Sequence, residues 1–171
     1  MTRQPLSLQH GFTLLEVLIA IVVLSFGLLG LAGIQAVGIK NTHDADVRTR
    51  AVQQAYDMAD RIRANTIGAA AGAYDSIPSS VGTNPTCMAT TCSATQMRDH
   101  DRFIWNTNNQ AMLPSGGGTV TVATVGGTPT VIPNKQYLIT VMWNDRSDPT
   151  ITTPGTTCGT DITCFQLAFR P

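Results

Sequence analysis

Apolar residues fill one long run near the start of the chain. From Val17 to Ile34 every residue is apolar or glycine, except for Ser25. As an α-helix this run would be about 27 Å long, close to the thickness of the hydrocarbon core of a bilayer. The run therefore predicts a membrane-spanning helix. A cleaved secretory signal is disfavoured, because the run is long for one and Glu16 stands at its head.

Beyond Lys40 the apolar positions become periodic. They recur three and four residues apart, as on one side of a helix, and we expect this stripe to pack on a sheet. The stripe consists of Val47, Ala51, Ala55, Met58 and Ile62. On the remaining surface, acidic residues precede basic ones by four positions, an order that stabilises an exposed helix. These pairs are Asp44 with Arg48, Asp46 with Arg50, and Asp57 with Arg61.

A second helix is predicted after a connecting loop that runs from Thr66 to Cys92. Ser93 and Gln96 have the S-x-x-Q spacing of a capping box, and Pro114 with the glycines after it ends the helix.

Three neighbouring polar residues in this helix, Asp99, His100 and Asp101, raise the question of a metal site. Adjacent helical positions point in different directions, so that one ion would not easily meet all three. We expect them to lie on a solvated face instead.

Every second residue is apolar in three later segments, which predicts strands. The apolar positions are Val120 and Val122, then Tyr137, Ile139, Val141 and Trp143, and then Phe165, Leu167 and Phe169. The segments suggest a small antiparallel sheet of about three to four strands, with one face on the amphipathic helix. Residues 126–135 and the stretch from Asp148 to Thr157 are expected to be loops.

The composition limits the possible functions. The 171 residues suffice for one domain with an anchor. The 11 basic and 11 acidic residues cancel, and the basic residues beyond Asn65 are scattered, which argues against a nucleic-acid partner. No Ser-His-Asp signature, phosphate loop or HExxH motif occurs. His10, His43 and His100 are far apart. We therefore expect no enzyme and no cofactor.

The start of the chain resembles the leader and N-terminal helix of type IV pilins. The resemblance lies in residues 10–40, HGFTLLEVLIAIVVLSFGLLGLAGIQAVGIK. A short polar head, Gly11, the aromatic Phe12 and further apolar residues are followed by Glu16, the fifth residue after the expected cut.

Later segments are similar to one family of minor pilins, called type IV pilus modification protein or PilV. They are AVQQAYDMADRIRAN at 51–65, Trp105, LPSGGGTVTV at 113–122, and Trp143. The resemblance implies an α+β type IV pilin fold, in which a long N-terminal helix packs on a small antiparallel sheet beside a short second helix.

The resemblance also implies a division of the chain. Residues 1–11 would be a prepilin leader, 12–40 the transmembrane and assembly helix, and 41–171 the exported globular domain. Prepilin peptidase would cut between Gly11 and Phe12, where a residue without a Cβ lets the backbone approach the enzyme, and would methylate the new amine of Phe12.

Glu16 would be a docking group in such a pilin. A carboxylate alone at bilayer depth is costly, whereas the N-terminal ammonium of a neighbouring subunit in the same layer would neutralise it and set the axial register. The alternative is a side chain that reaches the headgroup layer from near the helix end.

Four cysteines form two close pairs, Cys87 with Cys92 and Cys158 with Cys164. Exported domains with modest cores use disulfides, and we favour two local bridges over the other connectivities and over a zinc site. In pilins a disulfide near the C-terminus closes a surface loop, and Cys158 and Cys164 occupy a comparable place.

The positive-inside rule does not by itself orient the chain, because Arg3 is outnumbered by Lys40, Arg48 and Arg50. The leader resemblance and the cysteines both favour a C-terminal domain on the outside.

The implied function is that of a minor pilin that helps to initiate or cap a type IV pilus, a machine of cell adhesion and twitching motility. Its partners would be prepilin peptidase, the inner-membrane assembly platform, other minor pilins, the major pilin and a large tip adhesin. The chain would lie in the bacterial inner membrane with a periplasmic domain, and later at the pilus tip. The alternatives are a type II secretion minor pseudopilin and a pilus subunit that binds DNA or another ligand.

Overall fold

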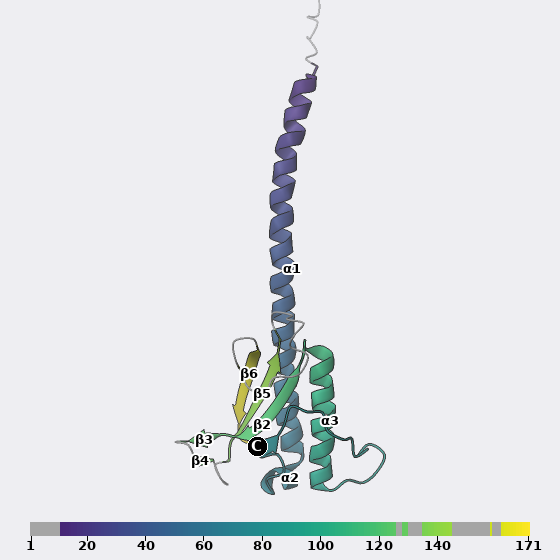
Figure 1. Cartoon of the computed structure of the whole chain (residues 1–171), viewed down its shortest axis with the longest axis vertical. Coiled ribbons are helices and arrows are strands. Elements are labelled where there is room, and N and C mark those ends of the chain that lie inside the picture. Colours follow the sequence, from purple (N-terminus) through teal and green to yellow (C-terminus); the bar gives the residue numbers. More distant parts are fainter. Residues whose placement is uncertain (1–10, 126–127, 130–134, 145–157, 159–161) are drawn as a thin grey trace, which may run out of the picture. The chain divides into compact units, whose positions relative to one another are not determined.

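The computed structural model describes residues 11–125, 128–129, 135–144, 158 and 162–171. The chain divides into two compact units, Met1–His43 and Asp44–Pro171. The first helix, α1 (Leu14–Ala64), contributes residues to both units (Figure 1). Its glycines, among them Gly27 and Gly30, do not interrupt it.

The predicted apolar stripe of α1 is confirmed. Its five residues are buried in one hydrophobic cluster with residues of the sheet. Two of the three predicted ion pairs form, with Arg50 Nε 2.9 Å from Asp46 Oδ2 and Arg61 Nε 2.8 Å from Asp57 Oδ2. Asp44 and Arg48, which both belong to the described residues, are not joined in this way.

The segment after α1 is more regular than the loop that we expected. The helix α2 (Thr66–Ala70) begins at once, and the Asn65 side chain accepts a hydrogen bond of 3.1 Å from the Gly68 N–H to cap it. The strand β1 (Ser76–Ile77) then joins the sheet. The loop prediction is wrong in these two places, because elements this short leave no periodic pattern in the sequence.

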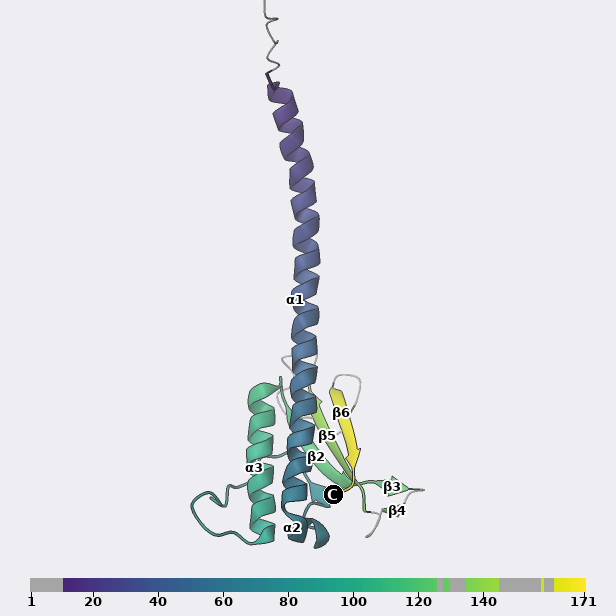
Figure 2. The same cartoon turned by 180° about the vertical axis from the view of Figure 1, so that it is seen from behind.

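The second predicted helix is confirmed as α3 (Ala94–Met112). Ser93 Oγ accepts a hydrogen bond from the Gln96 N–H, and Gln96 Oε1 accepts one from the Ser93 N–H, which is the predicted capping box. In both views α3 lies beside the C-terminal part of α1 (Figures 1 and 2).

The three predicted strands are present and form an antiparallel sheet with β1. They are β2 (Gly117–Val122), β5 (Tyr137–Trp143) and β6 (Thr163–Phe169), and the strand order is β1-β2-β5-β6. The register pairs Val120 with Ile139, and Ile139 with Leu167. This is the α+β arrangement that the resemblance implies.

Two shorter strands, β3 (Thr124–Val125) and β4 (Thr128–Pro129), make a small separate sheet. Because β4 falls within residues 126–135, the loop expected there is wrong at Thr128 and Pro129, while 126–127 and 130–134 lie outside the described residues. The loop expected from Asp148 to Thr157 also lies outside them.

Trp105 fixes α3 against both the sheet and α1. Its ring is completely buried, and its Nε1–H donates a hydrogen bond of 2.8 Å to the Gln54 carbonyl oxygen of α1. A Cβ at Gly118 of β2 would lie 2.2 Å from Trp105 Cη2. The absence of a side chain at Gly118 therefore allows the ring to lie directly on β2.

Candidate processing and assembly segment

The start of α1 is fixed by the residue before it. The Thr13 carbonyl oxygen accepts hydrogen bonds from the N–H groups of Glu16 and Val17, at 3.1 and 3.3 Å. The Thr13 hydroxyl also lies 3.3 Å from the Glu16 nitrogen and accepts from the same N–H. Thr13 is thus the N-cap of α1, and Glu16 occupies the third helical position. A carboxylate in the first turn also interacts favourably with the positive end of the helix dipole.

The two residues before Thr13 are open. Gly11 and Phe12 are outside the helix, and Phe12 is 84% exposed. A Cβ built at Gly11 would meet no atom within 4 Å, and the φ angle of Gly11 lies outside the left-handed region. Among the described residues, neither a close contact nor the backbone conformation requires a glycine at this position.

The first half of α1 exposes apolar side chains on every side. All large apolar residues from Phe12 to Ile39 are at least 46% exposed. Within the described residues, α1 is the one helix long and apolar enough to cross a membrane. A helix that is apolar all round is stable in a bilayer or among other apolar helices, and not in water.

Glu16 is the single charged residue between Gly11 and Ile39. It is exposed on α1, and no group among the residues that the structure describes covers it. The sequence predicted its place at the head of the apolar run. Its role as a first-turn helix residue was missed, although T-x-x-E before an apolar run is a known capping signature.

Comparison with protein families gives two matches. The prokaryotic N-terminal methylation motif matches residues 6–32, which include Gly11, Phe12 and Glu16. The Tt1218-like family, type IV pilin Tt1218, matches residues 33–103. The chain is thus similar to a type IV pilin over residues 33–103 and matches the methylation motif directly before them. No characterised protein and no solved structure gives a significant match.

The two matches bear on function and location. Type IV pilins are structural subunits rather than enzymes. A prepilin methylation motif implies processing by prepilin peptidase and assembly with other pilins, and together with the apolar helix it implies a membrane anchor and incorporation into a pilus. Neither match distinguishes the PilV family from other type IV pilins.

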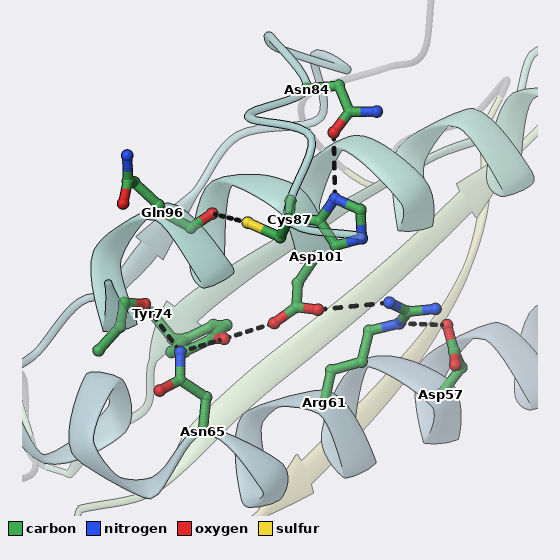
Figure 3. Close-up of polar contacts among 10 residues, drawn as sticks. Asp57, Arg61, Asn65, Tyr74, Asn84, Cys87, Gln96 and Asp101 are labelled. Carbon is green, nitrogen blue, oxygen red and sulfur yellow. Dashed lines mark hydrogen bonds and ion pairs between the residues drawn. The ribbon is translucent and has the colours of Figure 1, made fainter. Parts of the chain in front are cut away.

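A buried polar network holds the C-terminal unit together (Figure 3). Asp101 of α3, only 5% exposed, accepts from Arg61 Nη1 of α1 at 3.3 Å and from the Tyr74 hydroxyl at 2.5 Å. Asn65 Nδ2 donates to the Tyr74 oxygen at 2.9 Å. Three segments far apart in sequence thus meet at one carboxylate.

This environment changes the pKa of two members of the network. Burial, reinforced by the hydrogen bond to Asp101, raises the pKa of Tyr74 above its ordinary value. Burial lowers the pKa of Arg61, but Asp57 and then Asp101 outweigh it, so that the net pKa lies above the ordinary value. At neutral pH the network therefore holds a neutral phenol and a charged guanidinium.

The prediction of a solvated face at Asp99, His100 and Asp101 is wrong for the last two. His100 is 7% exposed, and its Nδ1 lies 3.0 Å from Asn84 Oδ1. Asp101 is buried because Arg61 and Tyr74 satisfy its two oxygens. Among the described residues, no three His, Cys, Asp or Glu side chains gather as a metal ion would require.

Both cysteine pairs are bonded locally, which is the connectivity favoured from the sequence. Cys87 is joined to Cys92, and Cys158 to Cys164 at the beginning of β6. The loop before α3 is also held by Arg102, whose Nε donates to the Ser80 carbonyl oxygen at 2.9 Å.

Proposed function

We propose that this pilin is a minor pilin of a type IV pilus, which takes part in the initiation of pilus assembly together with other minor pilins. The observation that carries the proposal is the lone carboxylate of Glu16 on an all-apolar, exposed helix. Such a surface needs apolar neighbours, and such a charge needs a cationic partner. The similarity of residues 51–65 and 113–122 to PilV supports the minor pilin class.

Leader removal is the first step of the proposed function. We propose cleavage between Gly11 and Phe12, methylation of the Phe12 amine, residues 12–40 as the membrane and assembly helix, and 41–171 as the exported domain. The open, non-helical Gly11 and the exposed Phe12 support this assignment.

Glu16 is the docking group in this proposal. After cleavage, each subunit has an ammonium at Phe12, four residues from its own Glu16 and at the same end of α1. The helix dipole places partial positive charge at that end, which disfavours an ammonium there unless a carboxylate of a neighbouring subunit offsets it. A pair between Phe12 of one subunit and Glu16 of the next fixes the axial register.

A charge-neutral variant tests the docking role. In Glu16→Gln the side chain keeps its size, and we expect normal leader removal with a several-fold loss of the chain from sheared pili. Ser25→Ala is the matched control, because Ser25 is polar, lies in the same apolar run and bonds to the Ile21 carbonyl oxygen of its own helix. Equal amounts of both variants in pili would contradict the docking role.

The proposed location is the inner membrane before assembly, with the C-terminal unit in the periplasm, and the pilus tip afterwards. The assembly platform, other minor pilins, the major pilin and a large tip adhesin are the proposed partners. Deletion of the gene should remove most surface pili, and quantitative mass spectrometry should find the chain far below the major pilin. A loss of protein secretion with normal pili would assign the chain to type II secretion instead.

Direct binding of DNA receives little support from the described residues. Arg50, Arg61, Arg63 and Lys135 each form an ion pair with an aspartate of the same chain. These cations are therefore already partly neutralised, which weakens any contact with phosphates.

A further inference from the structure

Thr13 lies between the expected cleavage site and the first residue of α1. Its hydroxyl and its carbonyl oxygen both accept from the N–H of Glu16, so the residue caps the helix with side chain and backbone together. An N-cap residue is itself outside the helix, and its side-chain bond exists only while the helix begins at the next residue. The cap therefore stabilises a start at Leu14.

Without this cap nothing else in the described residues holds the start at Leu14. Helices grow easily once nucleated, because each added residue contributes one hydrogen bond. Phe12 has no packing partner that would keep it extended, since it is highly exposed. Gly11 is a poor helix former, but it precedes the Gly11–Phe12 bond. It therefore does not keep Phe12 itself out of the helix.

A helical peptide bond is a poor substrate for hydrolysis. If the helix extended to Phe12, the Gly11 carbonyl oxygen would accept the first helical hydrogen bond, and side chains of the first turn would surround the peptide bond. A peptidase needs this carbonyl group free. Hydrolysis adds water across the Gly11–Phe12 amide, so that Gly11 retains a carboxylate and the Phe12 nitrogen leaves with the proton as an amine.

We propose that Thr13 is a positioning residue for leader removal. Its cap keeps the Gly11–Phe12 bond in a non-helical, open conformation that prepilin peptidase can bind. The inference depends on the proposed cleavage at this bond. It assigns to Thr13 a role that acts through the backbone and not through contact with the peptidase.

The test uses three full-length chains in membranes that contain prepilin peptidase, with leader removal followed over time on gels. Thr13→Ala removes the cap and favours helix, and we expect cleavage to slow by about two- to fivefold, given the usual strength of N-caps. The slower cleavage should appear as a higher KM with an unchanged kcat, because a smaller fraction of the chains has the non-helical conformation that the peptidase can bind. Thr13→Asn replaces the hydroxyl by another good N-cap, and we expect the wild-type rate.

The outcomes separate the inference from the proposed function. Wild-type cleavage of Thr13→Ala would overturn the role of the cap, and so would equal slowing of the Ala and Asn variants, which would show that the enzyme reads the threonine side chain itself. In either case cleavage of the wild-type chain at Phe12 leaves the proposed function intact. A wild-type chain that is never cut at this bond would overturn both.

Discussion

The hydroxyl of Tyr74 donates a hydrogen bond of 2.5 Å to Asp101 Oδ2, and this bond joins the segment before β1 to α3. The second oxygen of Asp101 accepts from Arg61 of α1. One buried carboxylate therefore connects the long helix, the second helix and the segment that leads into the sheet. Such a group stabilises the fold only while its partners remain.

Loss of the Asp101 charge should destabilise the C-terminal unit. In Asp101→Asn, Tyr74 and Arg61 lose their anionic partner, although Arg61 keeps its ion pair with Asp57. We expect the free energy of unfolding to fall by about 1–3 kcal/mol. Thermal unfolding of the full chain in detergent measures it. The control is Asp60→Asn, because Asp60 is an exposed aspartate paired with Arg63 on the same helix; equal effects of the two changes would contradict the role of Asp101.

Stability should decline in alkaline solution because of two buried phenols. Burial raises the pKa of Tyr74 and of Tyr137 above the ordinary value of 10.0, with hydrogen bonding to Asp101 in the first case and the charge of Asp75 in the second as further causes. Above pH 10 the unfolded chain therefore releases protons that the folded chain retains, which favours unfolding. Below pH 10 both the folded and the unfolded chain keep these protons, and the two tyrosines then contribute fully to the stability of the fold.

The expected slope is a loss of about 1.4 kcal/mol per pH unit for each such tyrosine. Urea unfolding at a series of pH values above 9 measures the slope. Tyr74→Phe should reduce the slope by about the contribution of one tyrosine. Tyr56→Phe, at a position that is 51% exposed, is the control and should leave the slope unchanged. A slope that is the same in all three chains would contradict the prediction.

The contact between Gly118 and Trp105 should not tolerate a methyl group. Gly118→Ala places a Cβ 2.2 Å from the ring, so that the ring or β2 must move, at a cost of about 1–3 kcal/mol. Gly38→Ala is the matched control, because a Cβ there meets nothing within 4 Å. Tryptophan fluorescence during denaturation reports the difference, and an unchanged midpoint for Gly118→Ala would refute the packing argument.

The disulfide between Cys87 and Cys92 should add stability without being required for the fold. The double change Cys87→Ser with Cys92→Ser removes a short loop closure, worth about 2 kcal/mol in the chain-entropy model. Arg102 with Ser80, and His100 with Asn84, still hold the loop to α3. We expect a lower Tm with an unchanged circular dichroism spectrum at 25 °C. An unfolded double variant would show that these bonds do not suffice.

Much of the fold was predictable because its signals are local. The capping box of Ser93 and Gln96 lies within one helical turn, and the stripe from Val47 to Ile62 follows the helical period, so both were read correctly. The burial of Asp101 was not predictable in this way. Its partner Arg61 is 40 residues away, and nothing in the local pattern indicates which polar residue of a helix finds a distant cation.

The sequence also predicts only part of the candidate processing and assembly segment. Gly11, Phe12 and Glu16 were predicted from the resemblance to pilin leaders, and the match to the methylation motif spans all three positions. Thr13 was not predicted, although its T-x-x-E spacing from Glu16 is a capping signature that the sequence contains. The group that would pair with Glu16 belongs to another subunit. The sequence of this chain alone therefore does not show the surface of that subunit.

The proposed function requires that the chain enter a pilus after cleavage between Gly11 and Phe12. Its most direct test is mass spectrometry of the chain recovered from pili sheared off cells. We expect an N-terminal peptide that begins with methylated Phe12 and contains an intact Glu16. A chain in pili that still carries Met1, or one that is cut elsewhere, would contradict the proposed cleavage between Gly11 and Phe12.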